Sequence, residues 1–210
     1  MPYDFKKEQR SLYLPKAEPE ILRVPPMRYL SVAGRGDPNA PDGDYQRAIA
    51  VLYAVAYALR MSAKGGYMIE GFFDYVVPPL EGFWRQKGSG GMDYAHKEAL
   101  EWLSVIRVPD FVTAENVAWA KEAAARKKSL DCSALSLTEI DEGLCVQLMH
   151  IGPYDAEPAS AARMDRFLAE NGYAADLTDT RLHHEIYLSD PRRTAPEKQK
   201  TVLRHPVRKL

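Results

Sequence analysis

The chain has 210 residues, a length that fits one domain or two small ones. Its composition is that of an ordinary globular protein, with 46% hydrophobic and 27% charged residues. Twenty-eight basic residues against 29 acidic residues leave a net charge of −1. Because dedicated nucleic-acid binders usually carry a large basic excess, this balance argues against nucleic acid as a partner.

Cysteine usage and apolar runs exclude two further classes of protein. Cys132 and Cys145 stand in unrelated local contexts, so they form neither a Cys-x-x-Cys motif nor a disulfide framework of the secreted kind. The N-terminal segment is charged and lacks the apolar core of a signal peptide. The longest apolar run, Ala48–Leu59, is shorter than the roughly 18–20 residues that a membrane span needs. We therefore predict a soluble, cytoplasmic protein with no membrane partner.

The first half of the chain predicts the order strand, helix, strand, strand. Met27–Ala33 is short and apolar and is stopped by a turn signal rich in Gly, Asp and Pro, so it predicts a strand. Asp44–Met61 predicts a buried helix that ends near a glycine pair. Phe72–Val77 is rich in aromatic and β-branched residues and meets two prolines, which favours a strand. Trp102–Val108 predicts the last strand, after a Gly-rich loop at 88–91.

The second half repeats that order after one connecting helix. Thr113–Lys128 predicts this helix, because Thr113 can cap its N-terminus and three basic residues stand at its C-terminus. A connecting strand is expected at Leu135–Ile140. The remaining elements are again strand, helix, strand and strand, expected at Leu144–Ile151, Ala159–Asn171, His184–Ser189 and Thr201–His205.

Matching segments in the two halves indicate an internal duplication. FDYVVPP at 73–79 aligns with EIYLSDP at 185–191, and IRVP at 106–109 aligns with LRHP at 203–206. We therefore predict an α+β fold of two β-α-β-β units related by a pseudo-twofold axis. The whole chain, 1–210, is then a single domain with a cleft at the axis, a common position for ligands. The expected bounds are about 25–109 for repeat one, 113–128 for the linking helix and 143–206 for repeat two.

The predicted strand near residue 185 carries the clearest candidates for chemistry. Alternation places His183, Glu185 and Tyr187 on one face, with neighbouring positions about 6–7 Å apart along the strand. A carboxylate and a phenol at this spacing could address one small ligand. The alternative is the solvent-facing polar side of a half-buried sheet. The duplication favours a ligand site, because it aligns Glu185 with Phe73 and Tyr187 with Tyr75 and so surrounds the carboxylate with aromatic rings.

Aromatic residues gather between Phe72 and Trp102 and include candidates for the walls of a pocket. Aromatic side chains are also ordinary core residues, so their number alone does not establish a pocket. No metal site or cofactor is predicted. His183 and Glu185 belong to an H-x-E sequence, but the P-C-x-x-C partner that zinc deaminases require is absent from the sequence.

Three stretches carry a family resemblance: HHEIYLSDPRRTAPEKQKTVLRHPV, FDYVVPPLEGFW and CVQLMHIGPYDAEP. They resemble the GyrI-like small-molecule-binding family, and more narrowly its stand-alone members of about this length. The resemblance covers nearly the whole chain, and EIYLSDP is its more specific motif. It implies a tandem of two β-α-β-β (SHS2-like) modules, in agreement with the duplication. No helix-turn-helix is expected, since the GyrI-like part already uses the available residues.

The resemblance also implies a function and assigns residues to it. Members include drug-sensing domains in which a buried glutamate faces cationic aromatic ligands, and a stand-alone branch that hydrolyses cyclopropane-bearing DNA-alkylating natural products. The family glutamate falls on Glu185 and its tyrosine on Tyr187. In a hydrolase of spirocyclopropyl cyclohexadienones, Glu185 would be the general base for water and Tyr187 would orient the water or the substrate. Ligand-binding roles are expected for Phe73, Tyr75, Trp84, Trp102 and His183.

A second function uses the same residues. In a binding or sensing module without turnover, Glu185 would pair with a cationic aromatic drug. A protein-interaction role has no motif to support it. The expected partners are planar aromatic small molecules, and the chain is expected to be a monomer or a homodimer. Because water and not the protein must attack a reactive electrophile, Cys132 and Cys145 are expected away from the pocket; whether 88–91 forms a lid is left open.

Overall fold

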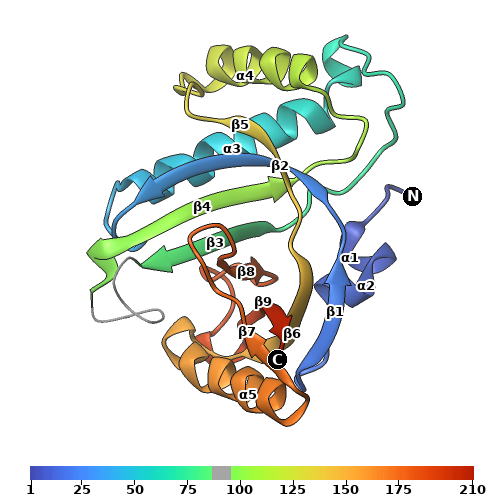
Figure 1. Cartoon of the computed structure of the whole chain (residues 1–210). Helices are drawn as coiled ribbons and strands as arrows, with labels where there is room; N and C mark the ends of the chain where they lie inside the picture. The colour runs from blue at the N-terminus through green and yellow to red at the C-terminus, as the bar shows by residue number, and fades with distance from the viewer. Residues whose placement is uncertain (87–95) are drawn as a thin grey trace.

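One antiparallel sheet organises the molecule, and the computed structural model describes residues 1–86 and 96–210 of it (Figure 1). The Gly-rich loop at 88–91 lies outside the described residues. The helices are α1 (Phe5–Glu8), α2 (Arg10–Tyr13), α3 (Asp44–Arg60), α4 (Ala114–Lys128) and α5 (Glu157–Glu170). The strands are β1 (Glu20–Val24), β2 (Met27–Arg35), β3 (Leu80–Gln86), β4 (Leu100–Arg107), β5 (Ser136–Ile140), β6 (Gly143–Ile151), β7 (Tyr173–Ala175), β8 (His183–Tyr187) and β9 (Lys200–Lys209). Among the described residues, no helix is long and apolar enough to cross a bilayer.

The strand order confirms the predicted α+β fold with two β-α-β-β units. The first unit is β2-α3-β3-β4 and the second is β6-α5-β8-β9. Across the described part of the sheet the strands follow the order β1-β6-β9-β8-β3-β4-β2-β5, with β7 paired to β9. In each unit the middle strand lies at the centre of the sheet, the last strand lies next to it and the first strand lies outside that. The order in one half of the sheet therefore mirrors the order in the other half about the central β3–β8 pair. This arrangement is what a pseudo-twofold axis between β3 and β8 produces.

The prediction of a strand at Phe72–Val77 is wrong, and with it the alignment of 73–79 on 185–191. The middle strand of the first unit is β3, which begins after the two prolines and pairs with β8. The aromatic stretch before the prolines forms no regular strand. Tyr75 makes an isolated parallel β-bridge with Tyr3. Aromatic residues favour strands because they pack well on a pleated surface. Here they pack instead against the N-terminal segment and Phe111.

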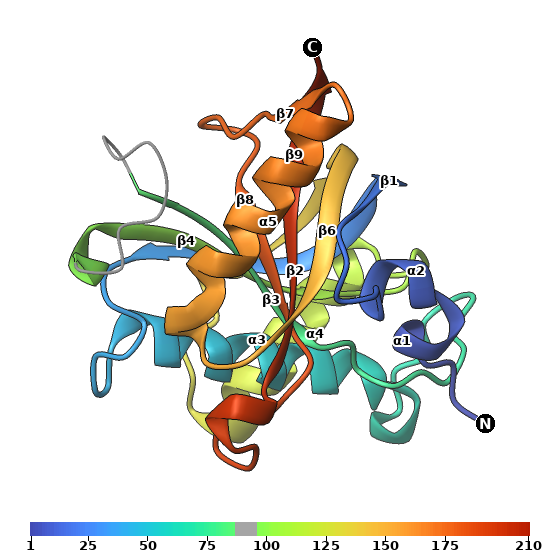
Figure 2. The ribbon, with the colours of Figure 1, turned by 90° about the horizontal axis from the view of Figure 1, so that it is seen from below.

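The two faces of the sheet are covered by different helices. The face that carries Trp84 and Glu185 packs on α3 and α5, and we call it the helix face. Figure 2 shows α5 in front of the strands of the second unit, and its buried side chains pack against those of β6 and β9. The opposite face packs on α1 and α2 through Phe5, Leu12 and Tyr13, and we call it the N-terminal face.

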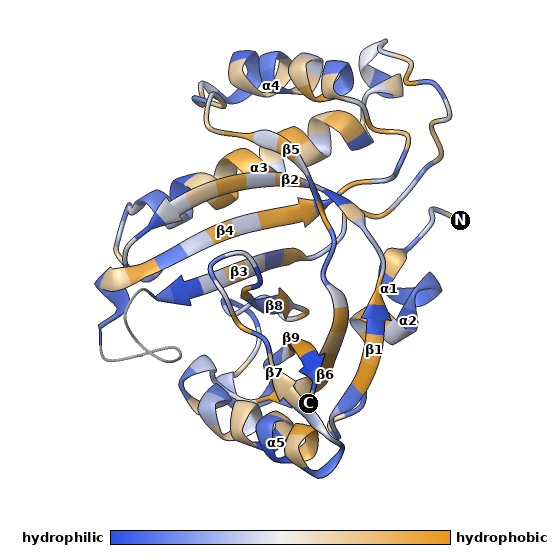
Figure 3. Ribbon diagram, viewed as in Figure 1, coloured by the Kyte–Doolittle hydropathy of each residue, from blue (hydrophilic) through white to orange (hydrophobic). Residues whose placement is uncertain are grey.

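The sequence of α3 explains how it covers the first unit. Ala48, Leu52, Val55 and Leu59 are spaced three or four residues apart and are all buried, so they form one apolar stripe. Asp44 in the first turn and Arg60 in the last turn match the helix dipole. Figure 3 shows apolar segments of α3 beside β2 and β4, and α4 lies on the outer side of α3.

A charged network is buried on the N-terminal face. Both ring nitrogens of His184 lie 3.0 Å from carboxylates, Nδ1 from Glu142 and Nε2 from Glu81. Arg204 donates to Glu142 at 3.0 Å, to Gln147, and to the backbone carbonyl of Leu12 in α2. Burial opposes the charged imidazole, but the two carboxylates raise the pKa of His184. The network therefore ties the N-terminal helices to the sheet through paired charges.

Glu142 is expected to hold this network together. Burial alone would raise its pKa, but His184 and Arg204 lower the pKa to about 2 from the ordinary 4.5. We expect Glu142→Gln to lower the free energy of unfolding at pH 7 by about 3–5 kcal/mol, because the buried Arg204 loses its paired carboxylate and His184 loses one of its two carboxylates. Urea unfolding measures the loss, and Glu122→Gln, in an exposed ion pair with Arg126, is expected to change it by less than about 1 kcal/mol.

The same loss should depend on pH. A carboxylate with a lowered folded-state pKa contributes its full stability above pH 4.5, and the contribution disappears as the pH falls toward 2. The difference between the wild type and Glu142→Gln should therefore shrink over that range. A difference that is already small at pH 7 would contradict this role for Glu142.

Candidate functional site

The candidate site lies on the helix face where the two units meet. The central strands β3 and β8 pair there, with Gly82 opposite Glu185 and Trp84 opposite His183. Because neighbouring strands place opposite residues on the same face, these side chains share one surface. The first unit presents α3 to this surface and the second unit presents α5. The predicted alternation of His183, Glu185 and Tyr187 on one face of β8 is confirmed by their mutual hydrogen bonds.

The Glu185 carboxylate is held by one donor at each oxygen. Tyr187 donates its hydroxyl proton to Oε2 at 2.7 Å, and Nε2 of His183 lies 2.9 Å from Oε1. The Tyr187 oxygen accepts in turn from the indole N–H of Trp84 at 2.9 Å. Glu185 is 6% exposed. The carboxylate is therefore oriented inside the protein by a fixed set of hydrogen bonds.

A second histidine, His205, extends this line of hydrogen bonds and determines which ring nitrogens of His183 and His205 carry protons. Nε2 of His205 lies 2.6 Å from Nδ1 of His183. Burial and the neighbouring His183 lower the pKa of His205 to about 3, so His205 is neutral at pH 7. With Glu185 ionised, Nε2 of His183 donates to the carboxylate, and Nδ1 of His183 accepts the Nε2 proton of His205. This assignment leaves Nδ1 of His205 unprotonated, which fits its lack of a hydrogen-bond partner among the described residues.

Three tyrosines near Glu185 are uncharged donors at neutral pH. Burial is the largest effect on each, and Glu185 adds to it by opposing a second negative charge. Together they raise the pKa of Tyr187 and of Tyr45 well above the ordinary value and that of Tyr154 to about 12. The Tyr154 ring meets the Tyr187 ring edge-on, with centroids 5.9 Å apart. Each phenol can therefore donate a hydrogen bond at physiological pH.

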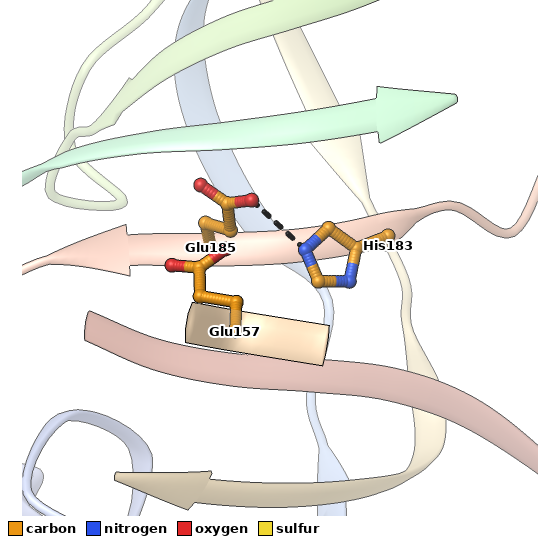
Figure 4. Close-up of side chains that lie close together, drawn as sticks. All are labelled: Glu157, His183 and Glu185. Atoms are coloured by element: carbon orange, nitrogen blue, oxygen red, sulfur yellow. Dashed lines mark hydrogen bonds and ion pairs between the residues drawn. The ribbon is translucent and has the colours of Figure 1, made fainter. Parts of the chain in front are cut away.

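Glu157 brings a second carboxylate that the sequence analysis missed. It is the first residue of α5 and is 1% exposed, and Figure 4 shows its carboxylate beside Glu185. One ligand atom each from Glu157, His183 and Glu185 lie within 4.8 Å of one another, which makes them a set able to hold a metal ion. The predicted helix begins only at Ala159, two residues after Glu157. Pro158 in the first turn, with an acidic residue before it, was the signal for the earlier start.

Trp84 and Trp102 lie in this region together with Tyr45 of α3. The Tyr45 ring lies 5.4 Å from that of Trp84 and 5.1 Å from that of Trp102, centroid to centroid. Two glycines, Gly34 and Gly82, leave space for these tryptophan side chains and for the Tyr187 hydroxyl. A Cβ at Gly34 would lie 2.2 Å from the Trp102 ring, and a Cβ at Gly82 would lie 2.6 Å from Nε1 of Trp84 and 3.0 Å from the Tyr187 hydroxyl.

The structure does not bring Phe73 and Tyr75 to Glu185. Both belong to an aromatic group on the N-terminal side, where each ring contacts Phe111. Tyr75 is 1% exposed and packs in the core of the N-terminal face. Their predicted place depended on the strand at 72–77 and the alignment with Tyr187, and both of these were wrong.

The two cysteines lie away from Glu185, as expected. Cys145 packs on the N-terminal face, and burial raises the pKa of its thiol to about 12. Cys132 precedes the edge strand β5, which β2, β4 and β3 separate from β8. A protonated thiol is a poor nucleophile, so neither cysteine is a reactive nucleophile near Glu185.

The comparisons with known proteins identify the family. The model of the GyrI-like small molecule binding domain matches residues 17–208. The chain therefore belongs to the GyrI-like small-molecule-binding family. The search of curated proteins found no significant match.

Solved structures agree with this family. An uncharacterized conserved protein from Listeria innocua is 47% identical, with a TM-score of 0.93 over 98% of this chain and 100% of that one. A hydrolase from Listeria innocua is 46% identical, with a TM-score of 0.89 over 98% and 100% of the two chains. The EcmrR C-terminal domain shares the fold at 14% identity, with a TM-score of 0.56 over 92% and 98%.

Gly82 is expected to be required for the contact between Trp84 and Tyr187. In Gly82→Ala the new methyl group would displace both side chains, so we expect a loss of about 1–3 kcal/mol in unfolding free energy and a shifted tryptophan emission. Gly65→Ala is the matched control, because a Cβ there meets nothing within 4 Å. Urea unfolding followed by fluorescence tests both variants. Equal stability and equal emission spectra for the two variants would contradict the close packing described here.

Proposed function

We propose that the protein is a hydrolase that adds water to the cyclopropane ring of spirocyclopropyl cyclohexadienones, DNA-alkylating natural products that it would thereby detoxify. The observation that carries the proposal is a buried carboxylate, Glu185, oriented by Tyr187 and His183 beside aromatic walls. The 46% identical Listeria innocua protein named a hydrolase supports an enzymatic function. The reaction class comes from the resemblance of the EIYLSDP region to the stand-alone branch of the family.

The reaction needs a base at one end of the substrate and a proton at the other. The oxygen of a water molecule forms a bond to a cyclopropane CH2 carbon, and the bond from that carbon to the spiro centre breaks. The released electron pair makes the dienone ring aromatic and places the negative charge on the former carbonyl oxygen, which takes a proton. The proton lost by water goes to Glu185, the general base. Solvent supplies the proton that the phenolate oxygen takes, and protonated Glu185 then returns its proton to solvent. The net reaction is the addition of one water molecule, and it balances without a metal or a redox cofactor.

The hydrogen bonds around Glu185 fit the role of a base. Tyr187 and His183 fix the carboxylate, so little reorganisation is needed when it takes a proton. His205 donates to His183, and His183 donates to Oε1, so the two imidazoles together fix one side of the carboxylate. Glu157 offers a further carboxylate within 4.8 Å of this pair, at which the attacking water can be held.

The surroundings of the base suit a flat, apolar substrate. Trp84, Trp102 and Tyr45 present rings that can pack against a polycyclic ligand. Glu185 is 6% exposed, so a substrate would reach it only when neighbouring groups move apart. Phe73 and Tyr75 have no part in this proposal. The cytoplasmic location and the choice between monomer and homodimer stay predictions.

Replacement of the base tests the proposal most simply. We expect Glu185→Gln to lower turnover of a spirocyclopropyl cyclohexadienone at least about 100-fold, because general base catalysis contributes roughly that factor or more. Substrate binding should persist, since the amide keeps the size of the side chain. Loss of the dienone absorbance measures turnover, and Glu170→Gln, an exposed residue at the end of α5, is the control that should keep full activity. Full hydrolysis by Glu185→Gln would contradict the role of Glu185.

A binding module without turnover is the second candidate. The observation that favours it is the pairing of two buried carboxylates, Glu185 and Glu157, which would attract a cationic aromatic drug. A spectral change that saturates at one equivalent of ligand, with no product, would support binding alone. In that case Glu185→Asp should keep partial affinity, because a counter-ion needs charge more than reach.

A further inference from the structure

A cavity of about 280 Å³ lies on the N-terminal side of the molecule. Tyr3, Phe5, Phe73 and Phe111 contribute aromatic rings to its lining. The Phe73 ring meets the Tyr3 ring at 5.6 Å and the Phe111 ring at 5.1 Å, in edge-to-face contacts. These residues come from the N-terminal segment, the loop before β3 and the loop after β4, so the cavity is separate from the Glu185 region on the helix face.

Arg107, the last residue of β4, lines the same cavity and is 7% exposed. Its Nη1 donates to the side-chain oxygen of Gln9 at 2.7 Å and to the Tyr13 hydroxyl at 3.4 Å. Its Nε is buried and has no hydrogen-bond partner among the described residues. The guanidinium carbon lies 4.6 Å from the centre of the Phe5 ring. Arg107 is therefore a buried cation whose donors are only partly used.

Buried charges usually have a counter-ion, and none of the described residues provides one for Arg107. Within the described part of the chain, no carboxylate forms an ion pair with Arg107, although Asp110 also lines the cavity. Glu81 is reached only through the Tyr13 hydroxyl and is already bonded to His184. The other buried arginine, Arg204, has Glu142 as its partner at 3.0 Å. Arg107 is therefore a buried guanidinium that no carboxylate of the described residues pairs with, and its Nε is open to a further acceptor.

Phe73 adds an independent observation. It is 42% exposed, although its ring contacts three other aromatic residues. A large aromatic side chain held at the rim of a cavity, with part of its surface open, is suited to cover a flat ligand. Its neighbour Tyr75, by contrast, is 1% exposed and belongs to the core.

We propose that this cavity is a second small-molecule site, which binds a small aromatic carboxylate. The ligand's ring lies against Phe73 and Phe111, and its carboxylate pairs with Arg107, whose guanidinium can take a planar anion through two donors. The Glu185 region does not suit this ligand, because Glu185 and Glu157 place two carboxylates there. The two sites therefore differ in the ligand that they accept: an anion in this cavity, and a neutral or cationic ligand beside Glu185.

Calorimetric titration with 1-naphthoate tests the proposal. We expect saturable binding at one site, and binding at least about tenfold weaker for the neutral 1-naphthamide, because a charge-assisted hydrogen bond is lost. Arg107→Gln should weaken 1-naphthoate binding by a similar factor. Phe73→Ala should weaken it several-fold while leaving the unfolding temperature nearly unchanged, since this side chain is partly exposed.

Two control variants distinguish binding in this cavity from binding elsewhere on the protein. Tyr57→Ala removes an exposed aromatic ring from α3, outside the cavity, and should leave the affinity unchanged. Glu185→Gln should also leave it unchanged, so the result does not depend on the function proposed for Glu185. Absence of 1-naphthoate binding, equal affinity in Phe73→Ala, or loss of binding in Glu185→Gln would each overturn the proposal.

Discussion

The pairing of β3 with β8 is the constraint on which the rest of the structure depends. These two strands are the middle strands of the two units, and their ladder is where the halves of the sheet join. It sets Gly82 opposite Glu185, and the missing side chain at Gly82 gives Trp84 and Tyr187 room to meet. A one-residue slip in this register would turn Glu185 to the other face. The position of the site and the joining of the units therefore have a single cause.

Adjacent residues of β8 serve opposite purposes because a strand alternates its side chains. His184 points to the N-terminal face, where hydrogen bonds to Glu81 and Glu142 raise its pKa and the network ties α2 to the sheet. Glu185 points to the helix face, where its hydrogen-bond partners are a phenol and an imidazole. The sheet thus separates a set of paired charges that supports the fold from the carboxylate that we propose as the base.

Local patterns in the sequence were sufficient for part of this arrangement. Period-two alternation placed His183, Glu185 and Tyr187 together, because that argument needs only that the segment be a strand. Residue composition failed at Phe72–Val77, since aromatic residues pack equally well in a loop against the N-terminal segment. Glu157 and the Arg204–Glu142 pair were out of reach for another reason: each depends on a contact between residues far apart in the chain, which no local pattern reports.

The central claim is that Glu185 acts as a base toward water and does not itself attack the substrate. A single turnover of a spirocyclopropyl cyclohexadienone in 18O-labelled water, with unlabelled enzyme in excess, tests this directly by mass spectrometry. The account predicts that the first product molecule carries 18O and that Glu185 stays unlabelled. Unlabelled product together with 18O in the Glu185 carboxylate would reveal an ester intermediate and would contradict the account.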